Sequence, residues 1–303
     1  MNQKKQIGTN HGIKRYKVSL IFTVLFLAFL AILDYPFLAR IYNQSRQNKA
    51  VVSYEENMGK IPEKEQGELL AAAQDYNLRL ASGTGMKLAS VFEEQEEEEA
   101  DVKDSETKKF HEEYESLLNT GGSGVMGRIE IPKTGVDMLI YHGTTEDVLQ
   151  RGAGHLEGSS LPVGGAGTHA CLSAHRGLAD KEMFSSLDEL EIGDIFLIYV
   201  LGETLCYQVR DIRTVLPDDT EKLVIKSGED LVTLITCTPY GINTHRLCVE
   251  GVRIPYTEDT EEGVQEQVDA FRFQRFIQNY GWILLSLVLV AAMGMMLWRY
   301  NKK

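Results

Sequence analysis

Residues 233–254 read TLITCTPYGINTHRLCVEGVRI. Two apolar runs with strand character flank a centre that contains proline, glycine and asparagine, which are typical turn residues. Cys237 ends the first run, and Arg246 opens the second run nine residues later. A hairpin return would bring Arg246 back beside Cys237. The stretch therefore predicts two paired strands that carry a thiol and a guanidinium next to a loop.

Outward from this stretch, short strand-like runs alternate with Gly, Pro and Asp turns from Gly124 onward. The runs are Gly127–Ile131, Val136–Tyr141, Ile195–Val200, Leu205–Ile212, Leu231–Thr236 and Leu247–Ile254. Many short strands with frequent turn signals predict a barrel or a sandwich. About 130 residues are enough for one closed β domain.

His175 closes a further strand-like run, so an imidazole also lies at a strand end. A thiolate attacks carbonyl carbon, an imidazolium can protonate a leaving amine, and an arginine can hold a developing oxyanion. Cys237, His175 and Arg246 are therefore candidate catalytic residues, and Thr236, which precedes the thiol, is a candidate for substrate contact. Taken singly, each also has an ordinary explanation, since a lone cysteine is more often a small core residue.

A metal site built from His169, Cys171 and His175 is a second interpretation, although their spacing includes no closed pair of ligands. The four cysteines, Cys171, Cys206, Cys237 and Cys248, form no C-x-x-C motif. The sequence leaves open whether any two of them pair. We expect no cofactor and no bound metal.

Two segments, residues 18–39 and 276–298, are apolar and near the length that crosses a bilayer as a helix. Lysines and arginines flank the outer side of each segment. The positive-inside rule then predicts both termini in the cytoplasm and the region between the segments outside the cell. A cleaved signal peptide is the alternative for the first segment, but no small-x-small cleavage site follows it. A buried core helix is the alternative for the second.

Charge is unevenly distributed in this chain, whose net charge is −13. Residues 93–104 contain eight acidic residues and one lysine, a net −7, which is typical of a solvated linker. No basic patch predicts a nucleic-acid partner. The predicted segments are a cytoplasmic basic tail at 1–17, a transmembrane helix at 18–39, a helical and acidic linker at 40–123, a β-barrel catalytic domain at 124–256, a juxtamembrane linker at 257–275, a transmembrane helix at 276–298 and a cytoplasmic basic tail at 299–303.

The stretch 233–254 resembles the active-site signature of class C sortases, which are cysteine transpeptidases of Gram-positive cells. It extends the general sortase pattern T-L-x-T-C…R with T-P-Y-G-x-N-T-H-R-L. Three further segments resemble the same class. They are IYHGT at 140–144, GHLEGSSLPVGGAGTH at 154–169 and SAHRG at 173–177.

This resemblance implies a mostly β fold, a closed eight-stranded sortase-type β-barrel with N-terminal helices and one transmembrane helix at each end. It implies that Cys237 is the nucleophile, His175 the acid and base, and Arg246 the cation that stabilises the transition state. The implied reaction cleaves an LPXTG-like sorting signal between Thr and Gly and transfers the acyl group to a pilin lysine amine. The implied partners are pilin or surface proteins with C-terminal sorting signals, and the lipid bilayer.

Two other functions stay open at this point. One is a housekeeping reaction that anchors surface proteins to a cell-wall amine, and the other is a non-enzymatic membrane scaffold.

One feature departs from the class C pattern. Class C sortases commonly carry a lid that an Asp-Pro-aromatic motif anchors, and residues 82–114 contain no Asp-Pro pair. We also expect Arg176, Arg246 and a protonated His175 to make the mouth of the site positive.

Overall fold

The computed structural model describes residues 3–84, 105–178 and 181–302. The chain divides into two compact units, residues 1–42 with 272–303, and residues 43–271. The expected acidic linker at 93–104 lies outside the described residues, as does most of the 82–114 region. The helices are α1 (Gln3–Met58), α2 (Glu63–Arg79), α3 (Ser105–Ser116), α4 (Glu146–Leu149) and α5 (Glu258–Lys302), and short non-α helical turns lie at Leu80–Thr84, Pro132–Thr134, Leu187–Glu189 and Glu221–Leu223.

The first unit consists of the outer parts of α1 and α5. Each helix includes a stretch that is long and apolar enough to cross a membrane, within Leu20–Met58 and Glu258–Arg299. Ser286 Oγ donates a hydrogen bond to Asp34 Oδ1 at 3.1 Å, and the rings of Phe37 and Trp282 stack with centroids 6.1 Å apart. The two apolar helices of this unit are consistent with a membrane-anchored protein.

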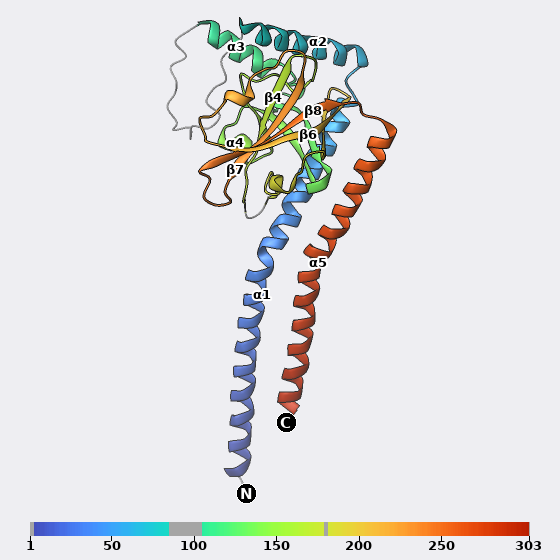
Figure 1. Ribbon diagram of the computed structural model, residues 1–303. Coiled ribbons are helices and arrows are strands. Elements are labelled where there is room, and N and C mark those ends of the chain that lie inside the picture. The colour runs from blue at the N-terminus through green and yellow to red at the C-terminus, as the bar shows by residue number, and fades with distance from the viewer. Residues whose placement is uncertain (1–2, 85–104, 179–180, 303) are drawn as a thin grey trace. The chain divides into compact units, whose positions relative to one another are not determined.

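The second unit contains a closed barrel of eight strands in the order β1-β2-β3-β4-β7-β8-β6-β5, seen in Figure 1. The pairs β2–β3 and β4–β7 are parallel, and the others are antiparallel. The predicted closed eight-stranded barrel is thus confirmed. The strands are β1 (Val125–Ile131), β2 (Val136–His142), β3 (Ala153–His155), β4 (Thr168–Ser173), β5 (Ile195–Val200), β6 (Glu203–Val215), β7 (Asp230–Thr238) and β8 (His245–Ile254).

The barrel interior is filled by the inward side chains of every strand, Ile129, Leu172, Leu234 and Val249 among them. Strand β7 is buried on both faces, because a second cluster covers its outer side. This cluster contains Leu156, Cys171, Leu223, Ile235 and Cys248. Burial on both faces explains why β7 reads as a continuous apolar run rather than an alternating one.

A glycine in β8 makes room for an aromatic pair inside the barrel. The rings of Phe196 and Tyr207 stack at 5.5 Å. A Cβ on Gly251 would lie 2.5 Å from the Phe196 ring and 3.1 Å from Tyr207 Cβ. Any larger residue at position 251 would have to displace this stack, which sits among the most buried side chains of the core.

The helices α2 and α3 lie together across one end of the barrel (Figure 1). Asn77 in α2 exchanges two hydrogen bonds with Leu161, donating to its carbonyl oxygen at 3.0 Å and accepting from its N–H at 2.7 Å. The rings of Tyr76 and Phe110 pack with centroids 4.9 Å apart. These contacts fix α2 to the loop that precedes β4 and fix α3 to α2.

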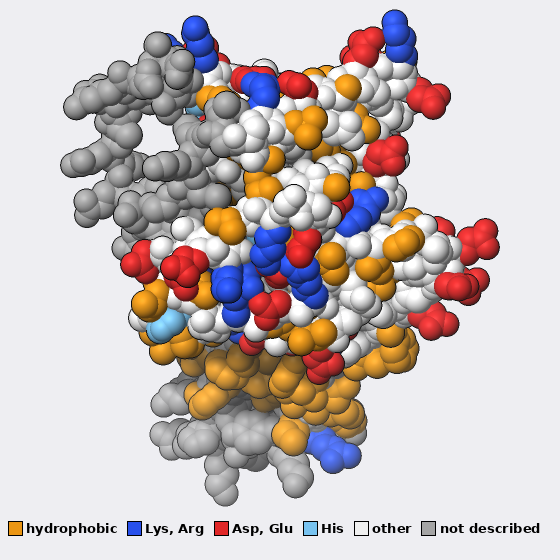
Figure 2. Space-filling model, turned by 45° about the horizontal axis from the view of Figure 1, so that its top comes forward, with side chains coloured by type: hydrophobic (Ala, Val, Ile, Leu, Met, Phe, Trp, Pro, Cys, Tyr) orange, Lys and Arg blue, Asp and Glu red, His pale blue; other side chains and the backbone are white. Residues whose placement is uncertain are grey.

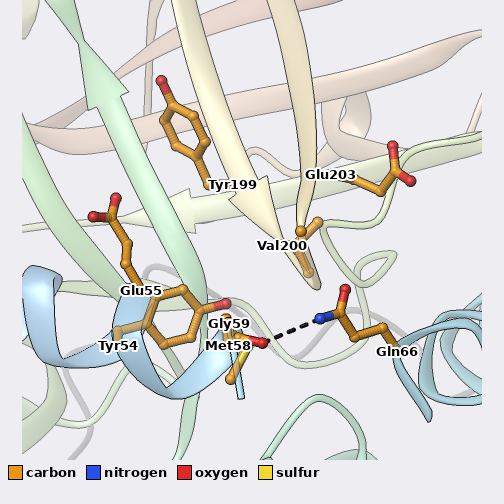
Figure 3. A pocket seen from close by; sticks show the side chains of 9 residues that line it. Tyr54, Glu55, Met58, Gly59, Gln66, Tyr199, Val200 and Glu203 are labelled. Atoms are coloured by element: carbon orange, nitrogen blue, oxygen red, sulfur yellow. Dashed lines mark hydrogen bonds between the residues drawn. The ribbon is translucent and has the colours of Figure 1, made fainter. Parts of the chain in front are cut away.

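A cavity of about 220 Å³ lies between the end of α1, the start of α2 and the β5–β6 hairpin (Figure 3). Gln66 Nε2 donates to Met58 O at 3.1 Å across its edge. Burial raises the pKa of Tyr54, in its wall, to about 12. Apart from the hydroxyls of Tyr54 and Tyr199, no nucleophilic side chain and no imidazole is among the residues that line this cavity.

On the outer surface, cationic and acidic side chains interleave rather than separate, as Figure 2 shows for one face. One charge cluster surrounds Glu250, which is 2% exposed. Its carboxylate lies 2.6 Å from Arg210, 3.1 Å from Arg213 and 3.5 Å from Lys226. Burial alone would raise the pKa of Glu250, but hydrogen bonds from the two arginines lower it to about 2.

Candidate active site

The strands β7 and β8 place Cys237 directly opposite Arg246. Cys237 is the penultimate residue of β7, and Arg246 is the second residue of β8. Directly opposed residues in an antiparallel pair are neighbours across the ladder. The structure therefore places Cys237 and Arg246 opposite each other, as the hairpin pattern predicted.

His175 reaches the same place from β4, which runs parallel to β7. Ser173 and Ile235 are register partners, and Ala174 N donates to Ile235 O at 3.1 Å. Parallel strands advance in step, so His175 lies level with Cys237 on the adjoining strand end. All three candidate catalytic residues therefore meet at one end of the barrel.

Thr236 has a structural role in this arrangement. Its side chain is 1% exposed, and its hydroxyl donates to Ala174 O at 2.8 Å. The bond fastens the residue before Cys237 to the residue before His175. A contact between Thr236 and substrate stays a prediction, and the bonded hydroxyl is turned toward β4.

The guanidinium of Arg246 contacts the loop that joins β7 to β8. Its Nη1 lies 3.1 Å from Asn243 O and 3.2 Å from His245 O. Asn243 has a φ of 61°, a left-handed conformation that asparagine tolerates better than most residues. The turn chemistry of the loop thus directs carbonyl groups toward the arginine.

Arg176 lies next to the candidate site, where we expected it to add positive charge. Its side chain is 9% exposed and contacts Asp188 Oδ2 at 2.5 Å. It also donates to Thr238 Oγ1 at 3.2 Å, and its guanidinium lies 5.9 Å from the centre of the Tyr240 ring. Arg176 therefore ties the residue after His175 to the residue after Cys237, and its charge is compensated by an aspartate.

The sequence did not identify an acidic partner for His175, and the structure contains one. Glu146 Oε1, at the start of α4, lies 3.2 Å from His175 Nε2. A hydrogen bond from Gln150, together with the imidazole of His175, lowers the pKa of Glu146. Since Glu146 is 29 residues from His175 in the chain, no local motif indicated this contact.

The other three cysteines differ from Cys237 in exposure. Cys171, Cys206 and Cys248 are at most 1% exposed, whereas Cys237 is partly exposed, and all four are free thiols. Burial raises the pKa of Cys171 well above its ordinary value and raises those of Cys206 and Cys248 to about 11. Among the four, Cys237 is therefore the cysteine that is partly accessible, and it remains the candidate nucleophile.

Two buried histidines, His155 and His169, are held in structural contacts. His155 is fully buried, and this burial lowers its pKa to about 4. His169 lies 3.0 Å from Val224 O through Nδ1 and 2.8 Å from Thr233 Oγ1 through Nε2, and burial lowers its pKa too. The imidazole of His169 is thus already bonded on both sides. Across the described part of the chain, no three His, Cys, Asp or Glu side chains cluster to hold a metal ion.

A closed β-barrel that carries a cysteine, a histidine and an arginine at neighbouring strand ends is typical of a cysteine-dependent enzyme. A family model described as the sortase domain matches residues 129–254. Among curated proteins, the chain is similar to sortase A of Bacillus anthracis (32% identity, 42% of this chain and 59% of that one) and to sortase D of Bacillus subtilis strain 168 (29% identity, 42% and 63%). The match thus spans about three fifths of the length of these relatives.

Solved structures match over more of the chain. Sortase C1 of Streptococcus agalactiae has a TM-score of 0.60 and 42% identity, covering 69% of this chain and all of that one. Sortase C-1 of Actinomyces oris has a TM-score of 0.57 and 40% identity, covering 64% and 100%. The sortase C of Streptococcus pneumoniae, described with respect to pilin substrate specificity, has a TM-score of 0.59 and 40% identity, covering 69% and 98%. The chain belongs to the sortase family, and its similarity to these sortase C structures supports class C.

Proposed function

We propose that this chain is a membrane-anchored transpeptidase that cleaves an LPXTG-like sorting signal between Thr and Gly and joins the acyl fragment to a lysine amine of a pilin. The observation that carries the proposal is the meeting of Cys237, Arg246 and His175 at one end of a sortase barrel. The similarity to sortase C structures, one of them described with respect to pilin substrates, favours a pilin as the substrate.

In the first half-reaction, the sulfur of Cys237 attacks the carbonyl carbon of the threonine, and the bond to the glycine nitrogen breaks. His175 as imidazolium gives its proton to the leaving amine, and Arg246 stabilises the negative charge on the carbonyl oxygen. A thioester remains on Cys237. Two nearby cationic groups favour the thiolate form of such a cysteine.

In the second half-reaction, the lysine amine of a second protein attacks the thioester, the sulfur leaves as thiolate, and His175 takes the proton from the new amide nitrogen. Membrane anchoring keeps the barrel close to substrates at the cell surface. The two apolar helices, α1 and α5, support this anchoring. Under this proposal, the barrel lies outside the cell and both termini lie in the cytoplasm.

The test uses the full chain in detergent with a sorting peptide and mass spectrometry. The wild type should show a mass increase on Cys237, and Cys237→Ala should abolish it. Cys206→Ala, which alters a fully buried thiol, is the matched control and should still form the adduct. An adduct that persists in Cys237→Ala would disprove the nucleophile assignment, and the absence of any adduct in wild type would favour a scaffold.

The acceptor is tested by adding either a lysine-containing pilin peptide or a cell-wall amine to the acyl-enzyme. Selective conjugation to the lysine side chain supports the pilin reaction. Selective conjugation to the cell-wall amine instead would establish the housekeeping reaction and overturn the pilin assignment.

A further inference from the structure

Glu146 contacts His175 from an element that the catalytic motifs do not include. Glu146 is the first residue of α4, and its Oε1 lies 3.2 Å from His175 Nε2. His175 is 23% exposed and Glu146 is 68% exposed. An ion pair as exposed as this one contributes little to stability, so its effect is to be sought in the orientation and charge of the imidazole.

The carboxylate of Glu146 is directed by its own helix. Gln150 Nε2 donates to Glu146 Oε1 at 2.7 Å, one turn further along. The same oxygen therefore faces both the amide of Gln150 and the ring of His175. Because a carboxylate oxygen accepts more than one hydrogen bond, the two contacts are compatible, and Gln150 limits the rotation of the carboxylate.

The loop before α4 is fixed by α3. Gly143 N donates to the hydroxyl of Tyr114 at 2.9 Å, and Tyr114 is fully buried. That hydroxyl also lies 3.0 Å from His155 Nδ1. The hydroxyl of Tyr114 also donates to His155 O at 3.1 Å, and His155 Nε2 lies 2.8 Å from Ser160 O. A buried chain of hydrogen bonds thus sets the position of the residues that lead to Glu146.

A hydrogen bond to one ring nitrogen of a histidine decides which nitrogen is available for chemistry. A carboxylate at Nε2 accepts a proton from that atom only. We propose that Glu146 is a positioning residue for His175, which holds the Nε2–H, leaves Nδ1 to the reacting groups and favours the imidazolium that protonates the leaving amine. This inference rests on the proposed function for its role in turnover, but the state of the imidazole is testable without a sorting peptide.

The first experiment measures alkylation of Cys237 by iodoacetamide against pH, with the full chain in detergent. The other three cysteines are buried, so the label reports on Cys237, and His175→Ala identifies the inflection that belongs to the imidazole. Removing an adjacent carboxylate disfavours the imidazolium. In Glu146→Gln and Glu146→Ala, this inflection should move to lower pH, with a fall of roughly two- to fivefold in the imidazolium-to-imidazole ratio.

Asp147→Asn is the matched control. It removes the same charge from the neighbouring residue of α4, which is also exposed and makes no contact with His175. Its pH profile should coincide with that of wild type. The proposal would be overturned if the pH profiles of wild type, Glu146→Gln, Glu146→Ala and Asp147→Asn superposed. An equal shift in Asp147→Asn and Glu146→Gln would also overturn it, because the effect would then come from general charge rather than from the contact.

The second experiment measures turnover of the sorting peptide. Glu146→Ala should lower kcat roughly tenfold with little change in KM, since general acid catalysis depends on the aligned imidazole. Glu146→Gln keeps an oxygen that accepts from Nε2 and should retain more of kcat than alanine does. A change confined to KM would contradict a positioning role. Wild-type protein that shows the His175-dependent inflection but never cleaves peptide would refute the proposed function while leaving the Glu146 contact supported.

Discussion

Arg246 stands opposite Cys237, and its guanidinium contacts two carbonyl oxygens, that of Asn243 in the adjoining loop and that of His245 at the start of β8. A planar guanidinium presents several N–H groups in a fixed fork, so it can keep these contacts while another N–H points elsewhere. A lysine has one compact ammonium group and cannot do both. The shape of the cation therefore matters at this position, as well as its charge.

We predict that Arg246→Lys lowers kcat/KM for a sorting peptide by about a hundredfold, the usual cost of losing one oxyanion donor. Arg253→Lys, on the same strand but beside Tyr207, is the control and should stay near the wild-type value. Steady-state kinetics by chromatography of the cleaved peptide measures both. Near-normal turnover in Arg246→Lys would show that charge alone is sufficient.

Glu250 gives a prediction on pH. Its pKa in the fold is about 2, below its ordinary value of 4.5, so its contribution to stability is full above about pH 4.5 and is lost as the pH falls toward 2. Acidification from pH 6 to pH 3 should lower the free energy of unfolding of both proteins. The decrease should be smaller in Glu250→Gln than in wild type, by roughly 2 kcal/mol. Denaturant titrations of the full chain at several pH values measure this.

Glu221→Gln, at an exposed position, serves as the control and should follow the wild-type pH dependence. An identical loss of stability with acid in wild type and in Glu250→Gln would mean that the carboxylate is not held by Arg210 and Arg213 as the structure shows.

At the scale of elements, the pairing of β4 with β7 sets the distance between His175 and Cys237. The Thr236 hydroxyl closes this pairing at its end. Thr236→Val keeps the shape but leaves Ala174 O without its donor. We predict a loss of about 1–3 kcal/mol in the free energy of unfolding and a lower kcat. Thr236→Ser keeps the hydroxyl and should recover most of both.

Thermal or urea unfolding and peptide turnover of the two variants decide the point. If Thr236→Val and Thr236→Ser have the same stability and the same turnover, the hydroxyl does not hold the two strands together. If turnover falls in both variants while stability is unchanged, the substrate contact expected for Thr236 from the sequence would gain support over the structural role.

The elements that the sequence predicted are those with local signals. Alternating or continuous apolar runs identified β1, β2, β4, β5, β6, β7 and β8, and the turn residues between β7 and β8 correctly placed Arg246 beside Cys237. Strand β3 has three residues, too few for a period. The contacts of Glu146 with His175 and of Arg176 with Asp188 depend on how non-local strands and loops pack, which spacing in one sequence does not encode.

At the scale of the whole molecule, two apolar helices bracket the catalytic barrel in the chain. We predict that protease added to intact protoplasts removes the 40–275 region and spares tags at both termini, because the flanking cations favour the cytoplasmic side. Immunoblots against each tag measure this. Digestion of either tag in intact protoplasts would refute the predicted topology, and lysed protoplasts provide the control in which both tags are lost.

The parallel β4–β7 pair has a consequence for folding. Thr236 and Ala174 are 62 residues apart in the chain, so their strands can meet only after a long loop has closed. Contacts of high sequence separation form slowly, and their loop-closure entropy must be met before they contribute. A nascent chain that has been synthesised only as far as His175, just after β4, contains the imidazole but not yet Cys237. The reactive centre therefore comes into being only when the barrel closes, and a reactive Cys237 marks a completely folded protein rather than an intermediate.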